Sequence, residues 1–221
     1  MLIASAPMAI AFAETPKGVD QALKAAIGGS QRTPAFRLRD KYRHPVETLE
    51  FFGIQPDMRV VEVLPGRGWY TEILAPFLKE HGQLIEATPP ATSVNPFFRK
   101  MAGMYGKKLS DNPDLYGNVA TTAFEPPEYM PLGGPESADM VVTFLNLHDF
   151  VYSNAHNETT DAIVQRFFLS AYQVLKPGGV LGIVEHRAKA GESVADAITK
   201  GRVPQDYAIR AARHAGFVLA R

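Results

Sequence analysis

Side chains suited to acid–base chemistry follow two apolar runs of the sequence. His148-Asp149 comes after the run that ends at Leu145, and Glu185-His186 comes after a second run. A histidine near its ordinary pKa suits proton transfer at neutral pH, and a neighbouring carboxylate can orient it or share the proton. We therefore predict His148, Asp149, Glu185 and His186 as catalytic residues.

The same clusters also allow a structural interpretation. In this alternative His148 hydrogen-bonds a helix end, and Glu185 and His186 form a structural pair with Arg187 or Arg43. Arg43 precedes a predicted helix over residues 45–52, and it either covers the cleft or lies on the surface.

A glycine turn follows a β-branched run, in the order Glu62-Val63-Leu64-Pro65-Gly66-Arg67-Gly68. Glycine lets the backbone approach a ligand closely, and the next helix presents free N–H groups at its start. The turn therefore suits a cofactor, although a tight strand-to-helix turn needs no ligand. The predicted cofactor-binding residues, at this turn and at other strand or helix ends, are Glu62, Leu64, Pro65, Gly66, Gly68, Tyr70, Thr88 and Asn146.

The elements that must position these residues alternate along the chain. β-branched or apolar runs predict strands at 59–64, 82–88, 118–124, 140–145, 180–184 and from 216. Apolar residues at helical spacing predict helices at 19–27, 45–52, 69–80, 96–108, 159–175 and 204–215. Pro76 requires a kink or a break, and Lys176-Pro177-Gly178-Gly179 should end a helix. The predicted fold is α/β, a Rossmann-like, doubly wound, mainly parallel sheet with an N-terminal helical extension. Such sheets bind ligands beyond the carboxyl ends of their strands.

Composition favours one globular domain that acts on a small molecule. The 221 residues are 46% hydrophobic and 21% charged, with 23 basic and 23 acidic side chains. This balance provides no field to attract nucleic acid. The absence of cysteine excludes disulfides, thiolate metal sites and a cysteine nucleophile. No motif predicts a metal, and nothing in the sequence requires an oligomer.

The N-terminus resembles a secretory signal. Residues 1–13 are apolar and end in Ala11-Phe12-Ala13, although no basic residue precedes the apolar run. The predicted organisation is a signal peptide at 1–13, a helical extension at 14–55 and a Rossmann-like domain at 56–221. A cleaved signal implies a periplasmic or secreted protein, and an ordinary N-terminus implies a cytoplasmic one. The run is too short to span a bilayer.

Several short motifs occur along the chain. They are Arg43-His44-Pro45, Phe51-Phe52-Gly53, the glycine turn with Trp69-Tyr70-Thr71, Leu74-Ala75-Pro76, Asn146-Leu147-His148-Asp149, Lys176-Pro177-Gly178-Gly179 and Glu185-His186-Arg187. Together these motifs resemble the class I S-adenosylmethionine-dependent methyltransferases, and more narrowly a subgroup of predicted bacterial enzymes that often carry a signal peptide. The resemblance implies S-adenosylmethionine as cofactor and methyl transfer to a small molecule. A binding module that kept the fold without the activity is the alternative.

The sequence departs from this family at three places. Leu64 replaces the first glycine of the loop, so we expect the loop to take a different path. Thr88 stands where the family has an acid for the ribose, with Glu86 as a possible substitute on the same strand face. The final strand of the usual seven is missing after residue 219, which predicts an unpaired sheet edge and low stability.

Two aromatic segments have packing as their simplest explanation. We expect Trp69 to pack against the N-terminal helices. The Phe and Met stripe from Phe97 to Tyr105 has the spacing of a buried helix face.

Overall fold

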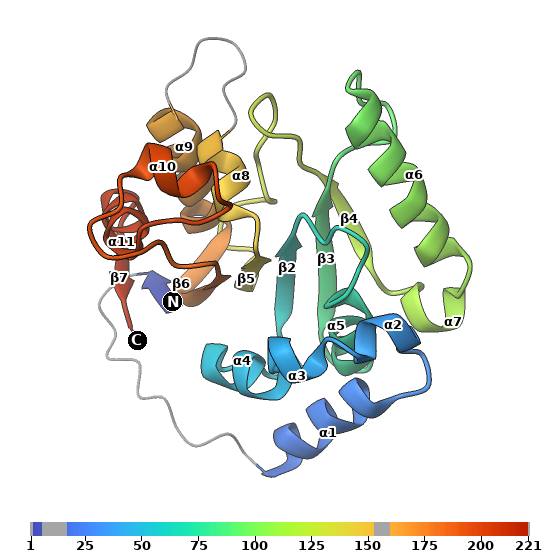
Figure 1. The fold of residues 1–221 in the computed structure, drawn as a ribbon. Helices are drawn as coiled ribbons and strands as arrows, with labels where there is room; N and C mark the ends of the chain where they lie inside the picture. The colour runs from blue at the N-terminus through green and yellow to red at the C-terminus, as the bar shows by residue number, and fades with distance from the viewer. Residues whose placement is uncertain (1, 6–16, 153–159, 221) are drawn as a thin grey trace.

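A mainly parallel sheet forms the centre of the computed structural model, which describes residues 2–5, 17–152 and 160–220 (Figure 1). The strand order is β4-β3-β2-β5-β6-β1-β7. Strands β4, β3, β2, β5 and β6 pair in parallel, whereas β1 is antiparallel to both of its neighbours. The strands are β1 (Leu2–Ser5), β2 (Arg59–Val63), β3 (Gln83–Thr88), β4 (Ala120–Ala123), β5 (Ala138–Phe144), β6 (Leu175–Val184) and β7 (Phe217–Leu219). The predicted α/β class is confirmed.

Helices cover both faces of the sheet (Figure 1). One apolar cluster joins α1, α4 and α5 to one face, and a second joins α8, α9 and α11 to the other. The helices of the first half are α1 (Lys17–Gly28), α2 (Pro34–Arg37), α3 (Asp40–Arg43), α4 (Pro45–Phe52), α5 (Thr71–Leu78), α6 (Pro96–Ser110) and α7 (Pro113–Tyr116). Those of the second half are α8 (Leu147–Tyr152), α9 (Thr160–Val174), α10 (Val194–Ile198) and α11 (Gln205–His214).

The Lys-Pro-Gly-Gly turn differs from its prediction. It does not separate α9 from a strand that starts at residue 180, because β6 already begins at Leu175. Leu175 pairs with Ala138 and Val180 pairs with Met140, so the register shifts between these two pairs. The turn is therefore an irregularity inside β6, and Gly178 takes a φ of 81° there.

Pro76 lies inside α5 without ending it. A proline has no N–H, so it leaves the carbonyl oxygen of Glu72 without its helical partner. The side chain of Gln31 supplies the missing donor, with its Nε2 at 3.2 Å from that oxygen. The helix therefore does not break at Pro76, and a side chain from another segment satisfies the backbone there.

The expected open edge next to β6 is filled. No strand follows β7 among the described residues, but β1 lies between β6 and β7 and pairs with both. The prediction of an unpaired edge is wrong for this reason: a strand distant in sequence takes the position. Residues 6–13 of the predicted signal peptide lie outside the described residues. None of the described helices is long and apolar enough to cross a membrane.

Candidate functional site

The turn between β2 and α5 has a defined path. Gly66 and Gly68 take φ values of 61° and 77°, which glycine adopts without strain. Asn146, just after β5, donates its Nδ2 to the carbonyl oxygens of Val63 and Leu64 at 2.9 and 3.2 Å. Asn146 therefore holds the loop in place. It also lines a cavity beside the loop, which is described below.

Leu64 takes a left-handed backbone that glycine adopts more easily, with a φ of 51°. The expectation of a different loop path stays a prediction, and the loop reaches the turn through a positive φ at Leu64. The Leu64 N–H donates to the carbonyl oxygen of Ala87 at 2.9 Å, and the side chain packs against the core. These contacts offset a backbone strain of about 1–2 kcal/mol. Leu145, at the end of neighbouring β5, also has a positive φ, 61°. Strained backbone thus ends two adjacent strands at the site.

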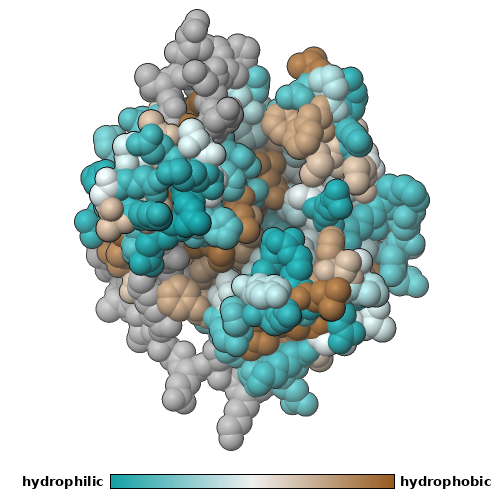
Figure 2. Space-filling view, in the orientation of Figure 1, coloured by the Kyte–Doolittle hydropathy of each residue, from teal (hydrophilic) through white to brown (hydrophobic). Residues whose placement is uncertain are grey.

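A cavity of about 150 Å³, here called the loop cavity, borders this turn. Figure 2 shows this side of the molecule hollowed between α6 and the helices α8 and α10. Five of the eight predicted cofactor-binding residues line the cavity, together with Asp149, Pro89 and residues of the first turns of α6. The lining residues are Leu64, Pro65, Gly66, Thr88, Pro89, Phe97, Phe98, Met101, Asn146 and Asp149.

Two buried carboxyl groups lie below the loop on neighbouring strands. Glu62 and Glu86 are register partners and are 2% and 0% exposed. Thr71 donates its hydroxyl to Glu62 at 3.2 Å, whereas neither oxygen of Glu86 has a hydrogen-bond partner among the described residues. Burial raises the pKa of Glu62 to about 7, and burial together with the Glu62 charge raises the pKa of Glu86 well above its usual value. The pair therefore retains at least one proton at neutral pH.

Glu86 does not reach the loop cavity. Its side chain is fully buried and is absent from the lining of the loop cavity, whereas Thr88 faces that cavity. Thr88 is therefore the better placed of the two for a ligand in the loop cavity, and its role in ribose binding stays a prediction.

The predicted catalytic residues separate into two groups. His148 Nδ1 lies 3.0 Å from Glu185 Oε2, and its Nε2 lies 3.5 Å from Asp149 Oδ1. Glu185 also accepts the backbone N–H of His148 at 3.1 Å. The hydrogen bond to Glu185 raises the pKa of His148. One line of contacts therefore joins Glu185, His148 and Asp149. Beside Glu185, His148 takes the place of the alternative partners Arg187 and Arg43.

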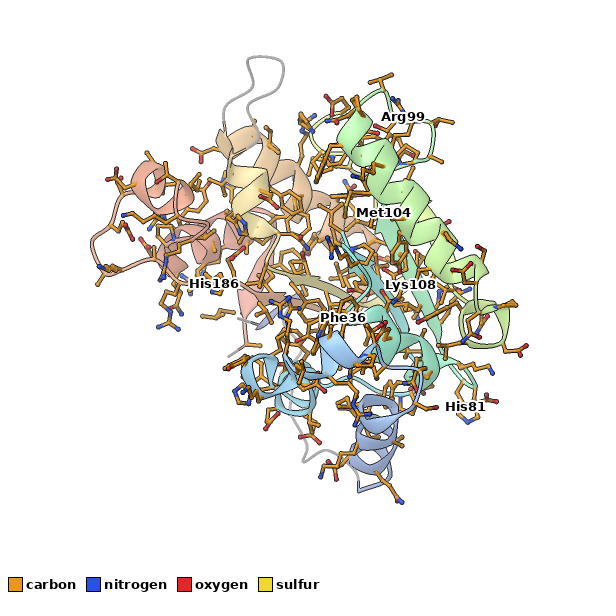
Figure 3. The ribbon with its side chains drawn as sticks, turned by 45° about the vertical axis from the view of Figure 1, so that its right-hand side comes forward. Phe36, His81, Arg99, Met104, Lys108 and His186 are labelled. Carbon is orange, nitrogen blue, oxygen red and sulfur yellow. The ribbon has the colours of Figure 1, made fainter. Side chains whose placement is uncertain are left out.

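His186 lies outside this line of contacts. Its backbone N–H donates to Glu185 Oε1 at 2.7 Å, but its side chain is exposed and lines a different cavity. Figure 3 shows His186 across the molecule from Met104 and Lys108 of α6.

A second cavity, of about 460 Å³, lies between α3 and the ends of β5 and β6. We call it the arginine cavity. Tyr70 forms part of its wall and stacks on Phe144, with ring centroids 3.4 Å apart. Its lining residues are Arg39, Tyr42, Arg43, Tyr70, Phe144, Leu145, Val184, Glu185 and His186. Tyr70 thus belongs to this cavity and is absent from the lining of the loop cavity.

Sequence reasoning missed part of the cavity walls. Phe97 and Met104, expected on a buried helix face, are 63% and 48% exposed, and Met101 lines the loop cavity. Only Tyr105 of that stripe is buried. A helix that covers a cavity shows the same apolar spacing as one that packs on a core, so the pattern could not distinguish them. Trp69 is 5% exposed, as expected, and donates its Nε1 to the carbonyl oxygen of Phe36 at 2.9 Å.

No protein-family model and no curated protein matches the sequence. Solved structures do match its fold. An S-adenosylmethionine-dependent methyltransferase from Aquifex aeolicus is 17% identical, with a TM-score of 0.61 over 91% of this chain and 90% of that one. An arsenic(III) S-adenosylmethionine methyltransferase from Chlamydomonas reinhardtii is 19% identical, with a TM-score of 0.54 over 88% of this chain and 61% of that one.

The fold also serves another chemistry. The [4+2]-cyclase SpnF is 16% identical, with a TM-score of 0.53 over 90% of this chain and 68% of that one. Fold similarity at this identity leaves the activity to be argued from the site. The chain has the fold of the class I S-adenosylmethionine-dependent methyltransferases.

Proposed function

We propose that this protein binds S-adenosylmethionine in the loop cavity and transfers its methyl group to a small molecule in the arginine cavity. One observation carries the proposal. The turn after β2 takes positive φ values at Leu64, Gly66 and Gly68, above the buried carboxyl of Glu62. This turn lies where parallel sheets bind nucleotide-like ligands, at the carboxyl ends of the strands.

The residues present fit such a cofactor. A side chain added at Gly66 would meet no atom within 4 Å, so the backbone there is open to a ligand. Thr88 would offer its hydroxyl to the ribose, and Phe97 and Met101 would cover the adenine. The bound cofactor supplies an electrophilic methyl group on a sulfonium centre. Thr88 cannot accept two hydroxyls as a carboxylate does, which predicts weaker binding than a family member with the acid would have.

The chain's own residues would position the acceptor and handle its proton. Methyl transfer is an in-line displacement that depends mainly on positioning. Glu185 lines the arginine cavity, and its side chain is 9% exposed. An acceptor hydroxyl or amine in this cavity would pass its proton to the Glu185–His148 pair. His148 is suited to retain that proton because its pKa is raised.

Calorimetric titration with S-adenosylhomocysteine tests the cofactor site. We expect wild-type protein to bind this product, and Gly66→Val to weaken binding at least tenfold by filling the loop cavity. Gly191→Val is the matched control. Gly191 also has a positive φ, 77°, and open space around it, but it lies outside the loop cavity. No heat at millimolar ligand, or equal losses in the two variants, would contradict the proposal.

Methyl transfer itself needs a second measurement. Incubation with S-adenosylmethionine labelled on its methyl group, and with phenolic and amine acceptors, should transfer label to an acceptor. We expect Glu185→Gln to lower the rate at least tenfold while leaving affinity for S-adenosylhomocysteine within twofold. Cofactor binding without transfer to any acceptor would instead favour the binding module.

A further inference from the structure

We propose that Arg39, Arg43 and His186 form an anion site that binds an acidic group of the methyl acceptor, an inference that rests on the proposed function. The acceptor class is a small, planar molecule that carries a carboxylate or a similar anion. The proposal depends on the state of Arg43, the walls of the arginine cavity and the place of Glu185 in it.

Arg43 is a partly buried cation without an acidic partner. No carboxylate lies within ion-pair distance of its guanidinium among the described residues, and its Nε is buried without a hydrogen-bond acceptor. Burial, and then the neighbouring charge of Arg39, lower the pKa of Arg43. An anion in the cavity would supply the missing counter-charge.

Arg32 provides an internal comparison. The guanidinium groups of Arg32 and Arg43 both lie 4.8 Å from the ring of Trp69. Arg32 has two carboxylates near it, at 2.9 Å in Asp40 and at 3.5 Å in Glu72. Carboxylates of the protein thus neutralise the charge of Arg32, whereas Arg43, beside the same ring, faces the arginine cavity. Stacking on Trp69 holds Arg43 in position, so a bound anion would meet a preorganised donor.

The remaining walls suit a flat molecule. Tyr42, Tyr70 and Phe144 contribute aromatic rings, and Arg39 and His186 add donors at the rim. Arg39 and Arg43 give this cavity two cations, while Glu185 is its only acidic lining residue among those described. An acidic group bound near the arginines would leave the reactive group of the acceptor to reach Glu185.

Paired probes test this site by calorimetry on protein saturated with S-adenosylhomocysteine. The probes are 4-hydroxybenzoate and 4-hydroxybenzamide, which differ mainly in charge. We expect wild-type protein to prefer the benzoate at least tenfold, and Arg43→Met to reduce the preference to less than twofold. Arg39→Met should lower it severalfold, and this exposed position keeps the test valid if Arg43→Met unfolds. Arg37→Met, which removes the same charge outside the cavity, should leave the preference unchanged.

The outcomes separate this inference from the proposed function. Equal affinities for the two probes in wild-type protein, or no binding of either at millimolar concentration, would overturn the anion site. A tenfold loss of S-adenosylhomocysteine affinity in Arg43→Met with an unchanged probe preference would also overturn it, because Arg43 would then bind the cofactor's own carboxylate. If S-adenosylhomocysteine does not bind wild-type protein, the proposed function fails, and with it the assignment to an acceptor.

Discussion

Glu72 and Glu86 are both buried carboxylates, with exposures of 1% and 0%, but their surroundings are opposite. Glu72 accepts the N–H and the hydroxyl of Thr33, at 2.8 and 2.6 Å. It also contacts the side chains of Arg32 and Lys108. Neither oxygen of Glu86 has a hydrogen bond of 3.5 Å or less among the described residues, and its polar neighbours are another acid, Glu62, across the strands and the hydroxyl of Tyr105.

Glu72 is therefore a structural carboxylate, whereas Glu86 is a buried acid that lowers the stability of the fold. Glu72 lies on α5 and ties the segment before α2, and α6 through Lys108, to the sheet domain. A buried carboxylate that accepts several hydrogen bonds is stable in its charged form. Burial without hydrogen-bond donors raises the pKa of a carboxyl group, so the group retains its proton. The destabilised pair lies directly under the proposed cofactor loop, where natural proteins tolerate such costs for function.

Breaking the Glu72 network should have the largest effect on stability. Glu72→Ala leaves Arg32 buried with a single carboxylate, that of Asp40, and removes the acceptor of Thr33. We expect a loss of about 3–5 kcal/mol in the free energy of unfolding, measured by urea denaturation. Glu47→Ala, at a carboxylate with 71% exposure, should change stability by less than about 0.5 kcal/mol. If Glu72→Ala lowers the free energy of unfolding by less than about 1 kcal/mol, Glu72 is not a structural carboxylate and the contrast with Glu86 fails.

The Glu62–Glu86 pair should appear as a pH dependence of stability. Both folded-state pKa values are raised, that of Glu62 to about 7. The folded protein therefore retains protons that the unfolded chain releases above its carboxyl pKa of about 4.3, and stability falls as pH rises through about 7. We expect Glu86→Gln to gain about 1–3 kcal/mol relative to wild type between about pH 5 and pH 8.

Urea unfolding of both proteins at the two pH values measures this change. The difference between pH values is the readout, because an amide in the same buried position changes the absolute stability for other reasons. Glu128→Gln, at an exposed position, should follow the wild-type pH dependence. A parallel pH dependence of Glu86→Gln and wild type would show that Glu86 titrates normally.

Local signals predicted the central strands and the position of the loop. The run before Glu62 is β-branched and bounded by turn residues, and β2 forms there with Val60, Val61 and Val63 fully buried. The strand ends of β2, β3 and β5 follow from such patterns, so the loop cavity could be located before its geometry was known.

Contacts between distant segments could not be predicted. The left-handed backbone of Leu64 depends on a hydrogen bond to the carbonyl of Ala87. The pairing of β1 depends on the space between β6 and β7, which β1 fills by pairing with both strands. Glu62 and Glu86 become neighbours only through the register of two strands. Arg43 is an ordinary basic residue in the sequence, because its missing counter-ion is a property of the folded cavity.

The smallest effect in this series should come from one hydroxyl of the Glu72 network. Thr33→Val keeps the side-chain shape and the backbone N–H bond to Glu72 Oε2, and it removes only the bond from Oγ1 to Oε1. Lys108 still contacts that oxygen, so the carboxylate is not left without a donor. We expect a loss of about 1 kcal/mol by urea denaturation, typical of one hydrogen bond whose acceptor stays satisfied. A loss as large as that of Glu72→Ala would mean that the network fails as a unit, and that the stability of Glu72 depends on cooperation among its donors more than on their number.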